Sequence, residues 1–280
     1  MIPSMLARTE ILKQVGTRTL LMGVLNVTPD SFSDGGRFTN VEATLAHARQ
    51  LAGEGADILD IGGESTRPGA SPVSLEEELK RAIPVIRAVR AELPQMCISV
   101  DTYKARVAEE ALEAGADMLN DVSALRFDSR MARVIAQADA PVVLMHMLGT
   151  PQTMQQSPTY KDVVAEIIKF LSERIVWATQ QGISEERIVI DPGIGFGKKP
   201  EHNTQILRRL SEFKVLGRPL LLGTSRKSFL GALTKRPVEK RVEETIASVV
   251  IGVLHGADLV RVHDVGPIKH ALMVADAIRY

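Results

Sequence analysis

The sequence predicts an α/β protein in which eight strand–helix units close into a (β/α)8 barrel. Eight short apolar runs rich in Val, Ile and Leu recur along the chain. They are continuous rather than alternating, as in parallel strands that are buried on both faces. Segments with helical spacing separate them, and no Pro-, Gly- or Ser-rich linker divides the 280 residues. We therefore expect a single domain over residues 1–280, close to the roughly 250 residues that are typical of this barrel.

The expected strands have similar lengths and lie at intervals that leave room for one helix each. A doubly wound open sheet is the alternative, but its Gly-x-Gly-x-x-Gly fingerprint is missing after the first strand. In chain order the expected strands are "LLMGVLNV" (21–28), "ADILDIG" (56–62), "CISVD" (97–101), "ADMLND" (116–121), "PVVLMH" (141–146), "RIVID" (187–191), "PLLLGT" (219–224) and "ADLVRVH" (257–263).

The segments between the strands carry helix start and stop signals. Residues 74–93 begin at Ser74, with Glu77 three places later, which is a capping box. Three other helical segments (41–57, 105–117 and 242–258) end in Gly-Ala-Asp and run directly into a strand. Glycine is preferred just after a helix. This weak internal sequence repeat is what a repeating β–α unit produces.

Composition narrows the class of function. The 34 basic and 34 acidic residues cancel, whereas nucleic-acid and membrane-surface partners usually demand a basic excess. Cys97 is the only cysteine, so no internal disulfide can form and a reducing compartment fits. The first residues lack the pattern of a signal peptide, and no apolar run approaches the roughly 20 residues of a membrane span. We expect a cytoplasmic protein that acts on small molecules.

Polar groups gather at the carboxyl ends of the expected strands, where the active site of a (β/α)8 barrel lies. A single Asp after a strand is more often a helix cap or a turn former, and a single His is more often structural. The coincidence of eight such ends on one rim favours a site, in which several members will still be structural. The ends are Asn26, Asp60, Asp101, Asn120 with Asp121, His146, Asp191, Thr224, and Arg261 with His263.

These side chains divide into two chemical groups. Asp101, Asn120 and Asp191 offer acceptors that suit a flat ring with adjacent N–H donors. Lys227, Arg261 and His263 offer cations near a helix start, in the loops that usually form the phosphate site of such barrels; Asn26 suits an oxygen-rich anion or a hydrated Mg²⁺. The rim therefore predicts a polar heterocycle on one side and an anion on the other.

Two long loops, at about 28–40 and 63–74, follow the first two strands. Their glycines make them pliable, and Phe32, Phe38 and the Arg67-Pro68 pair are candidates to close over a substrate. Loops of this length in a compact domain are often lids, although a surface insertion is the alternative.

No convincing nucleophile emerges from the sequence. Ser225 is in principle near His263. However, the order of the two residues in the chain and the distance between their strands do not match a nucleophile elbow. A transfer between two bound substrates is therefore favoured over a covalent enzyme intermediate.

Seven stretches together resemble the bacterial dihydropteroate synthases, from about residue 20 to residue 265. The combination is highly specific, and the one unusual variant is Lys199-Pro200 in a loop that commonly carries a smaller polar residue. The stretches are "LMGVLNVTPDSFSDGG", "GADILDIGGESTRPG", "SVDTYKARVAEEALEAGADMLNDVSA", "VVLMHMLGTPQTMQ", "IDPGIGFGKKPEHN", "LLLGTSRKSFLG" and "LVRVHDV".

The resemblance implies a reaction and a set of roles. The family condenses 6-hydroxymethyl-7,8-dihydropterin diphosphate with 4-aminobenzoate, on a (β/α)8 barrel that is usually dimeric. The implied pterin-binding residues are Asp101, Asn120, Met145, Asp191, Gly223, Lys227 and Arg261. The implied diphosphate-binding residues are Asn26, Arg261 and His263, with Mg²⁺ at Asn26. The implied aminobenzoate-binding residues are Phe32, Thr66, Arg67, Pro68, Phe196, Ser225 and Lys227. The implied catalytic residues are Asp34, Arg67, Asp101, Asp191 and Lys227, with Phe32 and Asp34 helping to close the site.

We expect a dissociative reaction in which diphosphate leaves first. Buried carboxylates such as Asp101 and Asp191 would stabilise the pterin-methylene cation that remains, and the neutral amine of aminobenzoate would attack it. Ordered loops would exclude water, which would otherwise capture the cation.

Two other functions remain open from the sequence alone. A methyltetrahydrofolate:corrinoid methyltransferase would share the Asp/Asn pterin pocket but should lack "SRKSFLG", "RVH" and the two long loops. A non-catalytic pterin- or phosphate-binding barrel predicts ligand binding without turnover.

Overall fold

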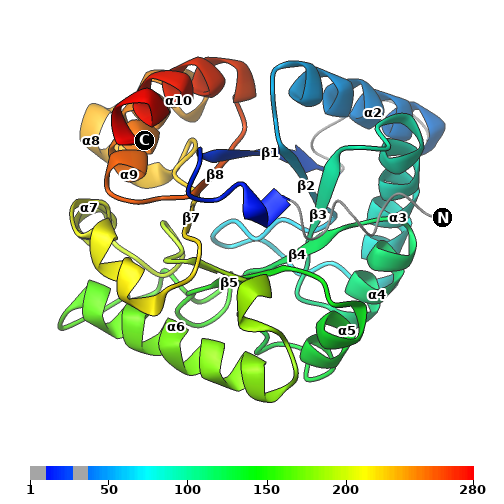
Figure 1. Cartoon of the computed structure of the whole chain (residues 1–280), viewed down its shortest axis with the longest axis horizontal. Helices are drawn as coiled ribbons and strands as arrows, with labels where there is room; N and C mark the ends of the chain where they lie inside the picture. The colour runs from blue at the N-terminus through cyan, green and yellow to red at the C-terminus, as the bar shows by residue number, and fades with distance from the viewer. Residues whose placement is uncertain (1–10, 28–36) are drawn as a thin grey trace.

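The computed structural model describes residues 11–27 and 37–280, apart from the side chains of residues 37–40. Eight parallel strands occupy its centre, and helices surround them (Figure 1). The strands are β1 (Leu20–Asn26), β2 (Ile58–Gly62), β3 (Cys97–Asp101), β4 (Met118–Asp121), β5 (Val142–Met145), β6 (Ile188–Asp191), β7 (Leu221–Leu222) and β8 (Leu259–Val262).

The order of the strands confirms the predicted barrel. Neighbours pair in the order β6-β5-β4-β3-β2-β1-β8-β7. A parallel bridge between Ile190 and Leu220 joins β6 to β7, and this bridge completes the circle. Each strand overlaps its predicted apolar run, and the open-sheet alternative is excluded.

The helices also follow the predicted segments. Ser74 caps the helix after it, because its Oγ accepts a hydrogen bond from the backbone N–H of Glu77 at 3.2 Å. The helices are α2 (Arg37–Gly53), α3 (Leu75–Glu92), α4 (Ala105–Glu113), α5 (Met131–Ala138), α6 (Val163–Gln180), α7 (Pro200–Arg208), α8 (Ser228–Thr234), α9 (Val242–Leu254) and α10 (Val265–Arg279), with 3-10 turns η2 (Glu185–Arg187), η3 (Leu210–Leu216) and η4 (Val238–Lys240).

The first long loop is shorter than the predicted range of about 28–40. Helix α2 begins at Arg37, so residues 37–40 are helical. These four residues contain neither Gly nor Pro, and nothing in them stops the helix from extending back towards Gly36. The second loop has the predicted bounds, since β2 ends at Gly62 and α3 begins at Leu75.

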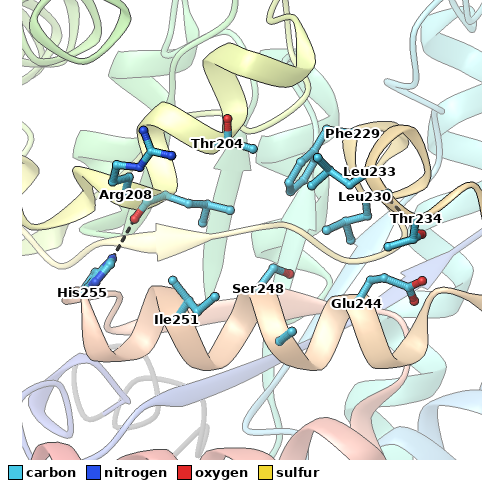
Figure 2. Close-up of a pocket in the computed structure, with 12 residues that line it drawn as sticks. Thr204, Arg208, Phe229, Leu230, Leu233, Thr234, Glu244, Ser248, Ile251 and His255 are labelled. Carbon is cyan, nitrogen blue, oxygen red and sulfur yellow. Dashed lines mark hydrogen bonds between the residues drawn. The ribbon is translucent and has the colours of Figure 1, made fainter.

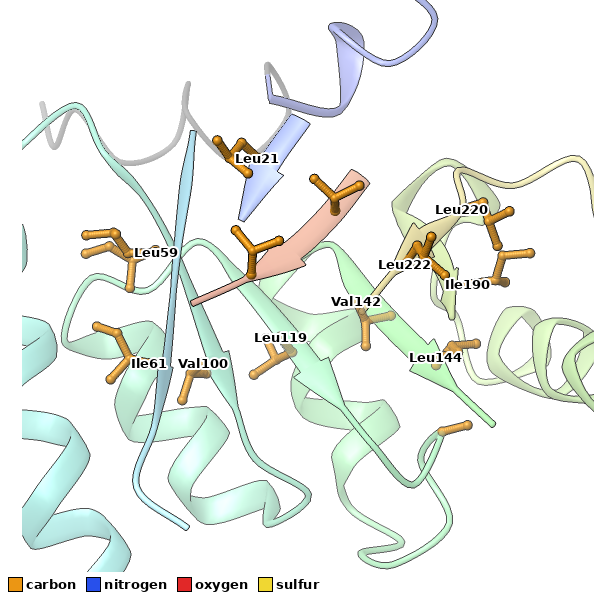
Figure 3. Close-up of a cluster of buried hydrophobic side chains, with 14 of the residues drawn as sticks. Leu21, Leu59, Ile61, Val100, Leu119, Val142, Leu144, Ile190, Leu220 and Leu222 are labelled. Atoms are coloured by element: carbon orange, nitrogen blue, oxygen red, sulfur yellow. The ribbon is translucent and has the colours of Figure 1, made fainter. Parts of the chain in front are cut away.

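Every strand packs on both of its faces. The outward side chains meet the helices, as Figure 3 shows for Leu59, Val100, Leu119 and Leu144. The inward side chains form a second cluster at the amino end of the barrel, and the apolar side chains of Ile11, Leu12 and Val15 pack against it. Its members are Leu20, Met22, Ile58, Cys97, Met118, Val143, Val189, Leu221 and Leu259.

The interior of the barrel changes from apolar to polar along the strands. Successive side chains of a strand point to opposite faces, so a residue two places after an inward one points inward as well. The next inward positions, nearer the carboxyl ends, are Val24, Asp60, Ser99, Asn120, Met145, Asp191, Gly223 and Arg261. Ordinary strand pleating therefore carries four residues of the predicted rim, Asp60, Asn120, Asp191 and Arg261, into the mouth of the barrel, and Asp101 follows two places after Ser99.

The three Gly-Ala-Asp sequences form the same structural motif, which occurs three times at the amino end of the barrel. Their glycines have φ angles of +100° at Gly55, +110° at Gly115 and +107° at Gly256, which favour glycine at a helix end. Each following aspartate accepts a backbone N–H at or just before the beginning of a strand and pairs with an arginine. The sets are Asp57 with Leu21 N and Arg18, Asp117 with Ile98 N and Arg90, and Asp258 with Leu220 N and Arg279.

Candidate active site

Two carboxylates and one arginine form the centre of the polar mouth. Asp60 on β2 and Asp101 on the neighbouring β3 share Arg261 from β8. Arg261 donates from Nε to Asp60 Oδ2 at 2.6 Å and from Nη2 to Asp101 Oδ2 at 2.9 Å. Asn120 Nδ2 also donates to Asp60 Oδ2, at 3.0 Å. The structure thus brings together three predicted pterin-binding residues around a fourth residue, Asp60.

The remaining oxygens of the two carboxylates face no donor. Oδ1 of Asp60 and Oδ1 of Asp101 are buried and have no hydrogen-bond partner among the described residues. A buried acceptor left in this state costs free energy that a bound N–H donor would recover. Burial raises the pKa of Asp101 to about 7, against the opposing charge of Arg261 and with the help of Asp60. Both oxygens suit a ligand that brings N–H groups.

Asp191 contributes a third carboxylate at the end of β6. Its Oδ1 accepts the backbone N–H of Gly193 at 2.6 Å, so it also forms the turn that its position before Pro192 allowed. Gly193 has a φ of +69°, and a Cβ there would lie 1.9 Å from the carbonyl oxygen of His146. Burial raises the pKa of Asp191 to about 6, although the Gly193 hydrogen bond opposes the shift.

Lys227 brings a cation to the other side of the mouth. Its Nζ lies 4.2 Å from the centre of the Phe196 ring, a cation–π distance. Burial lowers the pKa of Lys227 to about 8, and the charge of Arg261 adds to this, whereas Asp191 and Asp101 oppose it. Lys227 therefore lies between the carboxylates and the aromatic wall predicted for aminobenzoate.

Ser225 and His263 join the loops after β7 and β8. Ser225 Oγ lies 3.0 Å from His263 Nδ1 and accepts the backbone N–H of His263 at 3.2 Å. Burial, together with the charge of Arg261, lowers the pKa of His263 to about 3. The imidazole is therefore neutral at pH 7, and the prediction of His263 as a cation is wrong. If the Ser225 hydroxyl donates to Nδ1, Nε2 carries the proton and can donate to an anion. The pair fixes two loops and does not form a nucleophile elbow.

The loop after β2 brings a further cation to the mouth. Thr66 is half-buried and Arg67 and Pro68 are exposed. The charge of Arg67 lowers the pKa of both Lys227 and His263, which places it on the cationic side of the site. Within residues 11–27 and 37–280, Arg67 has no salt-bridge partner. Phe32 and Asp34, and with them residues 28–36 of the first predicted lid, lie outside the described residues.

The other predicted residues lie close to this arrangement. Met145 is buried in one small cluster with Phe196, and Gly223 lies beside Arg261, since a Cβ at Gly223 would be 3.9 Å from the Arg261 Cβ. Asn26 ends β1, half-buried and opposite Gly62 in the sheet. His146 has a structural role, which the sequence analysis gave as the more common one for a single histidine. It is buried, and its Nδ1 lies 2.9 Å from Lys198 Nζ.

The donor set fits a hydrated Mg²⁺ better than an enclosed metal ion. The described part of the chain contains no group of three His, Cys, Asp or Glu residues that could hold a metal. Asn26 offers a single amide oxygen. Mg²⁺ keeps several waters and binds mainly through phosphate oxygens when a protein supplies few ligands.

A separate hollow of about 440 Å³ lies outside the barrel, between α7, α8 and α9 (Figure 2). Its walls are mostly apolar, with Leu207, Phe229 and Ile251 among them. One of its polar groups is already used, since His255 Nδ1 lies 2.8 Å from the Leu207 carbonyl oxygen. The hollow contains none of the predicted site residues, and its charged lining residues are Arg208 and Glu244.

Asp60 is a site residue whose position at a strand end was predicted from the sequence but whose role was not. The signal was present, because Asp60 follows Ile58 by two places and so points into the barrel. Its partner Arg261 is 201 residues away along the chain, which no local pattern reveals. None of the described helices is long and apolar enough to cross a bilayer.

Comparison with known proteins identifies the class. The family described as pterin binding enzyme matches residues 22–263. The dihydropteroate synthase of Synechocystis sp. is 50% identical over 264 residues, covering 94% of this chain and 91% of that protein. The structure of Xanthomonas albilineans dihydropteroate synthase with 4-aminobenzoic acid is 50% identical, with a TM-score of 0.88 over 94% of this chain and 93% of that one. The same bacterium's enzyme in complex with 7,8-dihydropteroate is 46% identical, with a TM-score of 0.84 over 94% of both chains.

The chain therefore belongs to the pterin-binding enzyme family. Within that family, its relatives and structural neighbours place it among the dihydropteroate synthases.

Proposed function

We propose that this protein condenses 6-hydroxymethyl-7,8-dihydropterin diphosphate with 4-aminobenzoate, giving 7,8-dihydropteroate and diphosphate in folate synthesis. One observation carries the proposal: unpaired carboxylate oxygens and a wall of cations meet in one mouth of the barrel. The relatives at 45–50% identity bear the name of this activity.

The carboxylates account for the pterin. A reduced pterin is a flat ring with an amino group and adjacent N–H donors, which match Asp101, Asp191 and the amide of Asn120. Asp60 is not available as a free acceptor on both oxygens, because its Oδ2 already receives Arg261 and Asn120. We infer that Asp60 orients these two residues, and that Arg261 exchanges part of its carboxylate contacts for the ligand. Met145 and Gly223 complete the slot.

One cation and one neutral donor account for the diphosphate. Arg261 and neutral His263 can donate to its oxygens, and the N-terminus of α10 lies two residues beyond His263. Asn26 would hold a Mg²⁺ that arrives with the substrate; when bound, this ion neutralises negative charge on the leaving group. Removal of Mg²⁺ should accordingly slow product formation.

We infer a dissociative reaction from the same contacts. The bond from the pterin methylene to diphosphate breaks first, with both electrons leaving on the diphosphate oxygen. The carboxylates of Asp101 and Asp191 stabilise the positive charge left on the pterin. The neutral amine of aminobenzoate then forms the new C–N bond, and its proton passes to the released diphosphate. Thr66, Arg67, Phe196, Ser225 and Lys227 would hold aminobenzoate, with Arg67 and Lys227 facing its carboxylate.

The test is product formation from the two substrates, with and without Mg²⁺. Dihydropteroate and diphosphate should form in equal amounts, only when both substrates are present, as followed by chromatography. Binding of the pterin without turnover would instead support a non-catalytic barrel.

Arg261→Ala is the sharpest test of the anion side. We expect at least about tenfold weaker binding of the pterin diphosphate, because a charge-assisted contact to the leaving group is lost. Binding of a pterin without diphosphate should weaken less. Equal weakening for both ligands would contradict the assignment of Arg261 to the diphosphate.

We also propose that the protein is a homodimer. Helices α9 and α10 present exposed apolar side chains, of which Met273 and Val274 are each 63% and Ile278 is 70% exposed. Patches of this kind often mark an interface. Light scattering of the purified protein at micromolar concentration should give twice the chain mass, and a monomer would contradict the proposal. The cytoplasmic location, and the absence of nucleic-acid and membrane partners, stay predictions.

A further inference from the structure

A buried group of charges lies beneath the loop after β2. Lys104, three residues beyond the end of β3, forms salt bridges with Glu64 and, at 2.5 Å, with Glu78. The two glutamate side chains are 6% and 1% exposed, and that of Lys104 is 19% exposed. The hydroxyl of Tyr103 donates to the other oxygen of Glu64, at 2.5 Å. Four side chains from three segments therefore meet in one place.

The group holds the root of the loop that carries Arg67. Glu64 is the second residue after β2, and only Ser65 separates it from Thr66 and Arg67. Arg81 on α3 adds a hydrogen bond of 3.1 Å to the carbonyl oxygen of Gly63. At the far side of the loop, Gly69 N donates to the carbonyl oxygen of Pro151 at 3.0 Å. The loop is thus anchored on both sides of Thr66 and Arg67.

The same group is continuous with the pterin side of the mouth. Asp101 and Lys104 belong to one tetrapeptide, and the backbone N–H of Lys104 donates to Thr102 Oγ1 at 3.2 Å. The charge of Glu78 is also near enough to raise the pKa of Asp101. The end of β3 therefore supplies a pterin-facing carboxylate and, three residues later, the anchor of the neighbouring loop.

We propose that Lys104 is a positioning residue for the second substrate. By pairing with Glu64 and Glu78, it holds the loop of residues 63–74 so that Thr66 and Arg67 face the aminobenzoate. The inference rests on the proposed function for its substrate, and on the contacts alone for the placement of the loop.

The geometry favours positioning over simple stabilisation. Burying two carboxylates around one ammonium group is a weak way to stabilise a fold, since desolvation offsets much of the attraction. What such a group does supply is a fixed arrangement of three segments. Misplacing a substrate-facing side chain by about 1 Å can cost up to about a hundredfold in rate, so the fixed root of the loop has a direct use.

The experiment compares Lys104→Met with Arg90→Met as a matched control. Arg90 also pairs with a buried carboxylate, Asp117, and its side chain is 17% exposed, but it lies at the amino end of the barrel. In Lys104→Met we expect the KM for aminobenzoate, at saturating pterin diphosphate, to rise at least about tenfold. The Kd for the pterin diphosphate should change less than about threefold, and Lys104→Arg should recover part of the loss. Arg90→Met should leave both constants near those of the wild type.

A second readout does not depend on activity. Hydrogen exchange of the backbone amides in residues 63–74 should become faster in Lys104→Met and stay unchanged in Arg90→Met. If the wild type forms no product, the proposed function fails, while this exchange experiment still tests the anchor.

A milder variant covers the case in which Lys104→Met does not fold. Tyr103→Phe removes the hydrogen bond to Glu64 and keeps the salt bridges, so it should raise the aminobenzoate KM a few-fold. Equal changes in both substrate constants, or unchanged exchange in residues 63–74, would overturn the positioning role. Lys104 would then be structural.

Discussion

The two ends of the barrel use aspartate in opposite ways. At the amino end, Asp57, Asp117 and Asp258 accept backbone N–H groups at or just before the beginnings of strands and pair with arginines. At the carboxyl end, Asp60 and Asp101 share one arginine and keep one buried oxygen each without a partner among the described residues. One end is arranged to hold strands in place, and the other retains acceptors that a ligand can use.

This difference separates stability from function within a single residue type. Removing a buried carboxylate whose partners come from the protein destabilises the fold, because those partners are left buried without it. A buried carboxylate with an unused oxygen weakens the fold and gains its partner only when substrate binds. Substitutions at the two ends should therefore affect opposite properties.

The largest effect is expected for Asp101→Asn. We expect kcat/KM to fall at least about a hundredfold, because the charge that faces the developing cation is removed. The free energy of unfolding should stay the same or rise, since an incompletely paired buried charge is lost. Steady-state kinetics and thermal unfolding measure the two quantities. A variant with lower stability and near-normal kinetics would reverse the proposed roles of the two ends.

Asp117→Ala at the amino end should do the opposite. Its removal leaves Arg90 and the Ile98 N–H without their buried partner, so we expect a loss of about 3 kcal/mol in the free energy of unfolding. Denaturant unfolding measures this loss. At a temperature where the variant is folded, kcat/KM should stay within about twofold of the wild type. A large loss of activity in the folded variant would show that the two ends are coupled.

The pH dependence of pterin binding gives a third, smaller effect. The pKa values are raised, to about 6 for Asp191 and about 7 for Asp101, and only the ionised forms accept two N–H groups. Affinity should therefore increase as the pH rises through this range and level off above it. For Asp191 alone the gain between pH 5 and pH 8 is about tenfold. Calorimetric titration measures it, after correction for the ligand's own ionisation, and Asp191→Asn should reduce the pH dependence to the part that Asp101 contributes.

The smallest effect concerns the glycine that precedes Asp117. Gly115 has a φ of +110°, and a Cβ there would lie 2.8 Å from the Arg90 Cγ, so Gly115→Ala should cost about 1–2 kcal/mol of unfolding free energy. Gly53→Ala is the control, because a Cβ there would meet nothing within 4 Å. It should leave stability unchanged or raise it slightly. Equal effects would mean that the Gly-Ala-Asp turn does not strain a side chain.

The sequence was sufficient for the fold because the fold depends on local patterns. Continuous apolar runs, the Ser74 cap and the Gly-Ala-Asp stops each act within a few residues, and all three were correct. The start of α2 was missed because Thr39 and Asn40, two residue types that favour the N-cap, stand just before Val41, although the helix begins at Arg37. Such boundaries depend on weak preferences.

The site was only partly predictable from sequence, for a physical reason. Strand ends indicated which polar residues reach the mouth, since barrel topology brings them together whatever their identity. The pairing of Arg261 with Asp60 depends on side-chain rotamers across the barrel, and so does the group around Lys104. These contacts join residues 201 and 40 positions apart, respectively. A reading of single strands cannot supply them.

The closure of the barrel has a mechanical consequence. Among the described residues, β6 and β7 are joined as strands only by the Ile190–Leu220 bridge, and β7 is two residues long. This seam is the place where the cylinder should open first in thermal fluctuations. Asp191 and Phe196 stand on one side of it, and Gly223 and Lys227 on the other. A pterin bound between them would contact both sides of the seam. Substrate binding would therefore oppose the opening of the barrel at this point.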